Sequence, residues 1–124
     1  MSFSHNYQIL IVDDLVDNLF LLQFFLEDQG YQVDTATEGR TALTKIQASP
    51  PSLLLLDVMM PEMNGFEVAQ CLRQDNNLSS MNIVLITADK AVDLNQALAV
   101  GANDIIHKPI NFDELLSTVK IWCQ

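Results

Sequence analysis

Residues with reactive side chains follow four short apolar runs of this chain. They are Asp13 and Asp14 after the run 9–12, Asp57 after 53–56, Thr87 and Ala88 after 83–86, and Lys108 with Pro109 after Ile105-Ile106. If the runs are parallel strands, their carboxyl ends share the edge of the sheet where ligands bind in open α/β folds. Three carboxylates, a hydroxyl and an ammonium group are then expected to converge at that edge.

This set of groups points to metal-assisted phosphoryl chemistry. Carboxylates crowded at one edge repel one another and favour a bound cation, and oxygen ligands with open positions suit Mg²⁺. A carboxylate beside such a metal can attack phosphorus to give an aspartyl phosphate, with Lys108 and Thr87 as partners of the phosphoryl oxygens. Taken singly, each residue is typical of a helix cap, a turn or a solvated surface. The joint arrangement is what favours the chemistry.

The elements that must position these residues alternate between apolar runs and helical patterns. We expect strands at 9–12, 33–36, 53–56, 83–86 and 105–106, and helices at 15–28, 40–47, 66–73, 91–100 and 112–122. Three of the runs are continuously apolar, which is typical of strands buried on both faces of a parallel sheet. The chain is therefore predicted to have an α/β fold, with a doubly wound five-stranded parallel sheet and helices on both faces.

Composition excludes several classes of protein. At 49% hydrophobic residues the chain of 124 is too apolar for intrinsic disorder, and its net charge of −10 would repel a nucleic-acid backbone. No apolar run approaches the roughly 18 residues that a membrane span needs, and the first residues do not resemble a signal peptide. Two cysteines, Cys71 and Cys123, are too few for a disulfide framework. We expect one cytoplasmic domain over residues 1–124, with an oligomeric state that the sequence does not define.

Together, the reactive residues make the whole chain resemble a stand-alone response-regulator receiver domain of two-component signalling. The matching motifs are Asp13-Asp14, Asp57-Val58-Met59-Met60-Pro61-Glu62-Met63-Asn64-Gly65, Thr87-Ala88 and Lys108-Pro109. The resemblance implies a flavodoxin-like strand order, 2-1-3-4-5. It also implies a signalling switch rather than an enzyme.

The resemblance further implies a role for each residue of the site. Asp57 would accept a phosphoryl group from a phosphohistidine of a sensor histidine kinase or phosphotransfer protein, and the domain would then change its contacts with a downstream protein. Asp14 and Asp57 would bind Mg²⁺ directly, together with the carbonyl of Met59, whereas Asp13 would act through water. Thr87 and Lys108 keep the roles given above, and Ala88 would contribute to cofactor binding.

Two positions depart from the family pattern. Ile105 stands three residues before Lys108, where the family usually has a Tyr or Phe that couples to the threonine. Met59 occupies a position that is often polar and that bears on how fast the phosphate is lost. Because Ile105 has no aromatic ring, two outcomes remain open: the signal passes through the loop after Thr87 and the helix from about residue 91, or the conformational response is small. We favour the first. The resemblance implies a cis peptide before Pro109.

The predicted first helix carries more apolar residues than one buried face requires. A helix that lies on a sheet needs an apolar arc of only about 100°, yet Leu and Phe occupy most positions of the range 15–28. We expect some of Leu19, Phe20 and Phe24 to remain exposed. In the family this helix borders the kinase-docking face, so the surplus is interpreted as an interaction surface. The alternatives are a more deeply covered helix or a contact between two copies of the chain.

Three other functions remain open at this point. One is an aspartyl-phosphate phosphatase or phosphotransferase. Enzymes of that class have a second Asp two residues after the nucleophile, whereas this chain has Met59 at that position. A flavin-binding module would need a phosphate loop rich in Gly, Thr or Ser after the first strand, and residues 13–18 do not have that composition. A docking module that works without phosphorylation would have no need of the acidic set.

Overall fold

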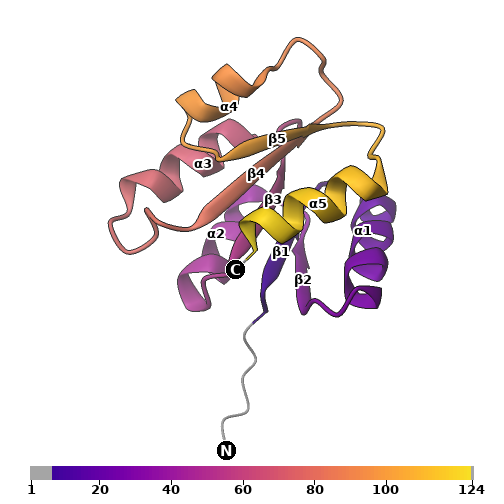
Figure 1. The fold of residues 1–124 in the computed structure, drawn as a ribbon. Helices are drawn as coiled ribbons and strands as arrows, with labels where there is room; N and C mark the ends of the chain where they lie inside the picture. Colours follow the sequence, from indigo (N-terminus) through magenta and orange to yellow (C-terminus); the bar gives the residue numbers. More distant parts are fainter. Residues whose placement is uncertain (1–6, 124) are drawn as a thin grey trace, which may run out of the picture.

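A five-stranded parallel sheet forms the centre of the molecule (Figure 1). The computed structural model describes residues 7–123. The strands are β1 (Ile9–Val12), β2 (Val33–Ala36), β3 (Leu53–Asp57), β4 (Asn82–Thr87) and β5 (Asp104–His107). The helices are α1 (Val16–Asp28), α2 (Gly39–Ala48), α3 (Gly65–Gln74), α4 (Leu94–Ala99) and α5 (Phe112–Trp122). The observed order β2-β1-β3-β4-β5 confirms the predicted fold class and topology.

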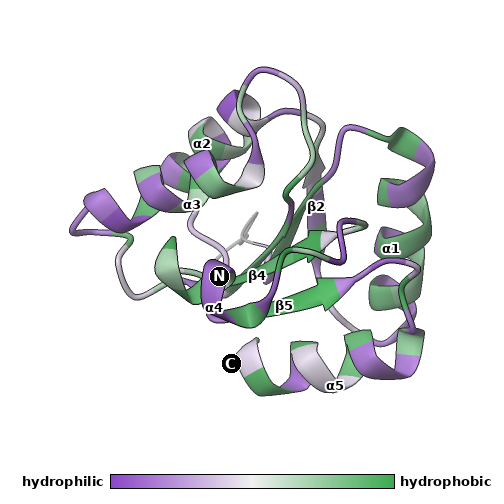
Figure 2. Ribbon diagram, turned by 90° about the horizontal axis from the view of Figure 1, so that it is seen from above, coloured by the Kyte–Doolittle hydropathy of each residue, from purple (hydrophilic) through white to green (hydrophobic). Residues whose placement is uncertain are grey.

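Helices cover both faces of the sheet because successive strand residues point to opposite sides. Ile9 and Ile11 contribute to a core shared with α1 and α5, whereas Leu10 and Val12 contribute to one shared with α2, α3 and α4. Figure 2 shows β4 and β5 in the green of hydrophobic residues between these helical layers, with polar residues on α2 and α3. Each central strand is thus buried on both sides, as its continuous apolar run predicts.

The register of the central strands brings the residues that follow them to the same edge of the sheet. Val12 pairs with Leu56 across β1 and β3, so Asp13 and Asp57 leave adjacent strands at the same level. Asp57 in turn pairs with Ile86 of β4, one residue before Thr87. The close approach of α3 to β3 requires Gly65, where a Cβ atom would lie 2.5 Å from the carbonyl oxygen of Asp57.

Helix boundaries agree with the sequence except in the fourth helix. Instead of running over 91–100, α4 begins at Leu94, because Asp93 and Gln96 form reciprocal side-chain to main-chain hydrogen bonds of 2.9 Å that cap it. At the end of α1, Gly30 adopts a φ of +97° and acts as the expected C′ glycine. No helix within residues 7–123 combines the length and apolar character needed to cross a membrane.

Candidate functional site

Three carboxylates meet at the carboxyl edge of β1 and β3. Oxygen atoms of Asp13, Asp14 and Asp57 lie within 4.8 Å of one another. Asp13 and Asp57 are only 2% and 3% exposed, whereas Asp14 is half-buried. The predicted acidic cluster is therefore formed, because adjacent parallel strands end at the same level.

The ammonium group of Lys108 bridges two of these carboxylates. Its Nζ lies 3.2 Å from Oδ2 of Asp13 and 3.1 Å from Oδ2 of Asp57. The lysine follows β5, and its main-chain N–H donates to the carbonyl of Thr87. The peptide bond between Lys108 and Pro109 is cis, as the resemblance implied. The predicted convergence of the lysine with the acidic cluster is thus present in the structure.

Of the remaining predicted residues, Met59 contacts Asp57, whereas Thr87 and Ala88 lie at the end of the neighbouring strand β4. The main-chain N–H of Met59 donates to Oδ1 of Asp57 at 3.1 Å, so the Met59 main chain lies beside the acidic cluster while its side chain is exposed. Thr87 is fully buried at the end of β4, and its Oγ1 accepts a hydrogen bond from the N–H of Asp89 at 3.0 Å. Ala88 is exposed immediately after it.

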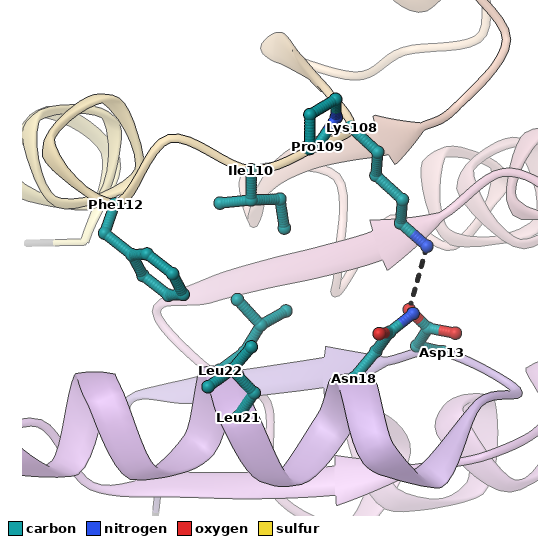
Figure 3. A pocket seen from close by; sticks show the side chains of 8 residues that line it. All are labelled: Asp13, Asn18, Leu21, Leu22, Lys108, Pro109, Ile110 and Phe112. Carbon is teal, nitrogen blue, oxygen red and sulfur yellow. Dashed lines mark hydrogen bonds and ion pairs between the residues drawn. The ribbon is translucent and has the colours of Figure 1, made fainter.

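A pocket of about 270 Å³ opens beside the acidic cluster, between α1 and the segment that joins β5 to α5 (Figure 3). It is lined by Asp13, Asn18, Leu21, Leu22, Lys108, Pro109, Ile110 and Phe112. The polar groups are gathered at one end, where Lys108 contacts Asp13. The other walls are apolar. A group that reaches Lys108 through this pocket would therefore pass between apolar side chains.

Comparison with known proteins identifies the family. The model of the response regulator receiver domain matches residues 9–120. The chain belongs to this family. Over 114 residues the receiver domain is 42% identical to the response regulator PleD of Caulobacter vibrioides, covering 91% of this chain and 25% of PleD. It thus spans about a quarter of the length of that relative.

Two solved structures are similar to this receiver domain. The chemotaxis protein CheY4 of Vibrio cholerae has a TM-score of 0.86 and 32% identity, over 94% of this chain and 98% of the other. The receiver domain of Ssk1 from Saccharomyces cerevisiae, in complex with the histidine phosphotransfer protein Ypd1, has a TM-score of 0.86 and 26% identity. That match covers 95% of this chain and 89% of the other.

The electrostatics of the receiver domain's site are dominated by burial. Loss of solvent and the nearby charge of Asp13 raise the pKa of the Asp57 carboxyl from 3.8 to about 6, although the Met59 N–H and Lys108 oppose the shift. Burial also disfavours the charged form of Lys108, but Asp57 and Asp13 outweigh it and raise the pKa of the ammonium group. The lysine therefore stays protonated at neutral pH, and Asp57 is ionised above about pH 6.

The donor set of the receiver domain fits a hard divalent cation. All three clustered side chains offer carboxylate oxygens, the atoms that Mg²⁺ prefers. Within the part of the chain that the structure describes, no side chain or N–H donates to the Asp14 carboxylate, whereas Asp13 and Asp57 both accept hydrogen bonds. The half-buried Asp14 is thus free to bind an ion. Lys108 alone does not balance the negative charge of the three carboxylates.

The exposed apolar residues of α1 agree with the sequence in part. Phe20 and Phe24 are 62% and 74% exposed, as predicted. Leu19 is 3% exposed, so its predicted exposure was wrong. It lies with Leu22 and Leu26 on the helix face that packs against the sheet, in the core shared with α5. On the neighbouring face, Phe25 packs against Phe112 in a tilted arrangement, with ring centroids 4.7 Å apart.

One polar residue of the site was missed from the sequence. Asn18, in the first turn of α1, donates from Nδ2 to Oδ2 of Asp13 at 3.3 Å and lines the pocket. An Asn in a first turn is usually interpreted as a local capping residue. Its partner Asp13 lies five residues earlier and precedes α1, so no helical spacing in the sequence connects Asn18 to the site.

Removing the charge of Asp57 is expected to stabilise the metal-free domain at alkaline pH. The pKa of this carboxyl is higher in the folded protein than its ordinary value of 3.8. The contribution of this carboxyl to the free energy of unfolding is therefore fully present below about pH 4 and is lost as pH rises through about 6. At pH 8 in EDTA, Asp57→Asn should raise the free energy of unfolding by about 1–2 kcal/mol, with a smaller gain at pH 5.

Urea denaturation at the two pH values measures this difference. Asp28→Asn, at an exposed position on α1, is the matched control and should give the same offset at pH 5 and pH 8. An Asp57→Asn variant less stable than the unmodified protein at pH 8 would show that the Lys108 ion pair outweighs the cost of burying the carboxylate.

Proposed function

We propose that this receiver domain accepts a phosphoryl group on Asp57 from a phosphohistidine of a histidine kinase or phosphotransfer protein. The observation that carries the proposal is the position of the buried Asp57 carboxylate, 3.1 Å from Lys108 and inside the acidic cluster. Phosphorylation then changes the contacts of the domain with a downstream protein. The proposal places the domain in the cytoplasm, where ATP supplies histidine kinases.

In this reaction a carboxylate oxygen of Asp57 attacks the phosphorus of the donor. The bond between phosphorus and the imidazole nitrogen breaks, its electron pair stays on the nitrogen, and the phosphoryl group becomes bonded to Asp57. Lys108, already beside the acceptor oxygen, stabilises the charge on the phosphoryl oxygens. The Thr87 hydroxyl, which accepts a hydrogen bond from the Asp89 N–H in this structure, gives up that bond and donates to the phosphoryl group. The main chain of Ala88 contributes to binding the same group.

Asp14, Asp57 and the Met59 carbonyl would hold Mg²⁺ directly, and Asp13 would hold it through water. The bound ion would neutralise charge on the transferred phosphoryl oxygens. The assignment is supported by the cluster of carboxylates and by the oxygens of Asp14, which accept no hydrogen bond from residues 7–123. Asp57 is ionised at neutral pH, so its oxygen is available as a nucleophile.

The proposed donor is a helical histidine protein that docks on α1 and the pocket beside Lys108. The complex of Ypd1 with the Ssk1 receiver domain is an example of such a partnership in a similar fold. In this chain, Phe20 and Phe24 expose apolar surface on α1, and apolar side chains line the pocket next to the acidic cluster. Both features suit an apolar partner surface.

Incubation with a small phosphodonor and Mg²⁺ should add a single acid-labile phosphoryl group to the protein. Intact-mass measurement detects the product. Asp57→Asn, or chelation of the metal with EDTA, should abolish the labelling, because the first removes the nucleophile and the second the cation. Asp28→Asn is the control and should be labelled fully. Equal labelling of Asp57→Asn would sink the assignment of the acceptor.

Docking on α1 is tested by comparing phosphotransfer from a protein donor with labelling by a small phosphodonor. Phe24→Ser should slow phosphotransfer from a cognate phosphohistidine protein about fivefold or more, because it removes apolar contact area. Labelling by the small phosphodonor should change less than about twofold. Leu98→Ser, at an exposed apolar position on α4, is the matched control. The proposed surface is wrong if the two variants respond alike to the protein donor.

The conformational response is proposed to pass through the loop after Thr87. Ile105 is half-buried and packs against the core of α2, α3 and α4, and its aliphatic side chain has no ring to fill the space that Thr87 vacates. Beryllofluoride, a phosphate mimic, should therefore shift amide signals mainly over residues 88–93. Methyl NMR should show little rotamer change at Ile105. A large rotamer change coupled to Thr87 would overturn this route.

A further inference from the structure

Asn18 shares a carboxylate oxygen with the lysine of the site. Its Nδ2 lies 3.3 Å from Oδ2 of Asp13, and Nζ of Lys108 lies 3.2 Å from the same oxygen. The other oxygen of Asp13 accepts the N–H of Leu15 at 2.9 Å. Figure 3 shows Asn18 and Asp13 side by side below Lys108, at the polar end of the pocket.

Asp13 depends on these donors because it has almost no contact with water. Its exposure is 2%, and a buried carboxylate oxygen without a hydrogen-bond donor carries a large desolvation penalty. Lys108 is not committed to Asp13 alone, since its Nζ also lies 3.1 Å from Oδ2 of Asp57. When the ammonium group turns to a phosphoryl group on Asp57, Asp13 loses this direct charged partner and keeps only the water-mediated contact proposed with Mg²⁺.

We propose that Asn18 is a positioning residue that keeps Asp13 hydrogen-bonded while Lys108 moves to the phosphoryl group. The inference rests on the proposed function and adds to it a residue that does not touch the acceptor. A neutral amide suits the task, because it can donate to Oδ2 of Asp13 in both states and adds no charge. A cation at this position would compete with Lys108, and a carboxylate would repel Asp13.

The first test measures binding of beryllofluoride at saturating Mg²⁺. Asn18→Leu keeps the size of the side chain but removes its donor, and it should weaken binding of the mimic about tenfold. In an Asp13→Asn background residue 13 carries no charge for Asn18 to pair, so the same substitution should change binding less than about twofold. Gln23→Leu, on the same helix and outside the site, is the control and should have no effect in either background.

The two backgrounds separate failure of the inference from failure of the function. Equal weakening in both backgrounds would contradict the positioning role alone, because Asn18 would then act without Asp13. Absence of mimic binding by the unmodified protein would contradict the proposed function, and the inference with it.

The second test uses the metal-free protein and needs no phosphoryl chemistry. Lys108→Met mimics the state in which the ammonium group has left Asp13. Asn18→Leu should then raise the unfolding equilibrium constant about tenfold more in the Lys108→Met background than in the unmodified protein, measured by urea denaturation at pH 8. Additive effects would overturn the inference. If Lys108→Met does not fold, the same cycle is carried out with Asp57→Asn present in every variant, which lowers the charge repulsion.

Discussion

One ammonium group, that of Lys108, is shared by two carboxylates that have almost no contact with water. Its distances of 3.2 and 3.1 Å to Asp13 and Asp57 define the centre of the site. Buried carboxylates without a cation would repel one another and pay a large desolvation penalty. The arrangement of the sheet serves this contact, because it brings together two residues, Asp13 and Lys108, that are 95 positions apart in the chain.

The apolar strands make this concentration of charge tolerable. Residues 9–12 and 53–56 are fully buried, and the two cores on either side of the sheet hold β1 and β3 in fixed register. A rigid frame keeps like charges at a distance that a flexible chain would not adopt. The repulsion and desolvation of the clustered carboxylates cost free energy of folding. Binding of a cation and of a phosphoryl group can recover part of that cost.

The sequence predicts this site well because the site is a product of topology. Any residue that directly follows a buried parallel strand must lie at one edge, so Asp13, Asp57 and Lys108 could be brought together from their positions alone. The orientation of side chains on α1 was not predictable in the same way. The burial of Leu19 depends on which of several apolar faces of α1 meets the sheet. The contact of Asn18 depends on a side-chain rotamer that spacing does not specify.

The bare phenyl rings of α1 have a consequence for the behaviour of the protein in solution. Phe20 and Phe24 expose apolar surface on every molecule, and a net charge of −10 is expected to oppose the approach of two molecules. That repulsion acts over a Debye length, which shrinks from about 10 Å at 0.1 M salt to about 3 Å at 1 M. We therefore expect concentrated salt to favour reversible self-association of this domain through α1.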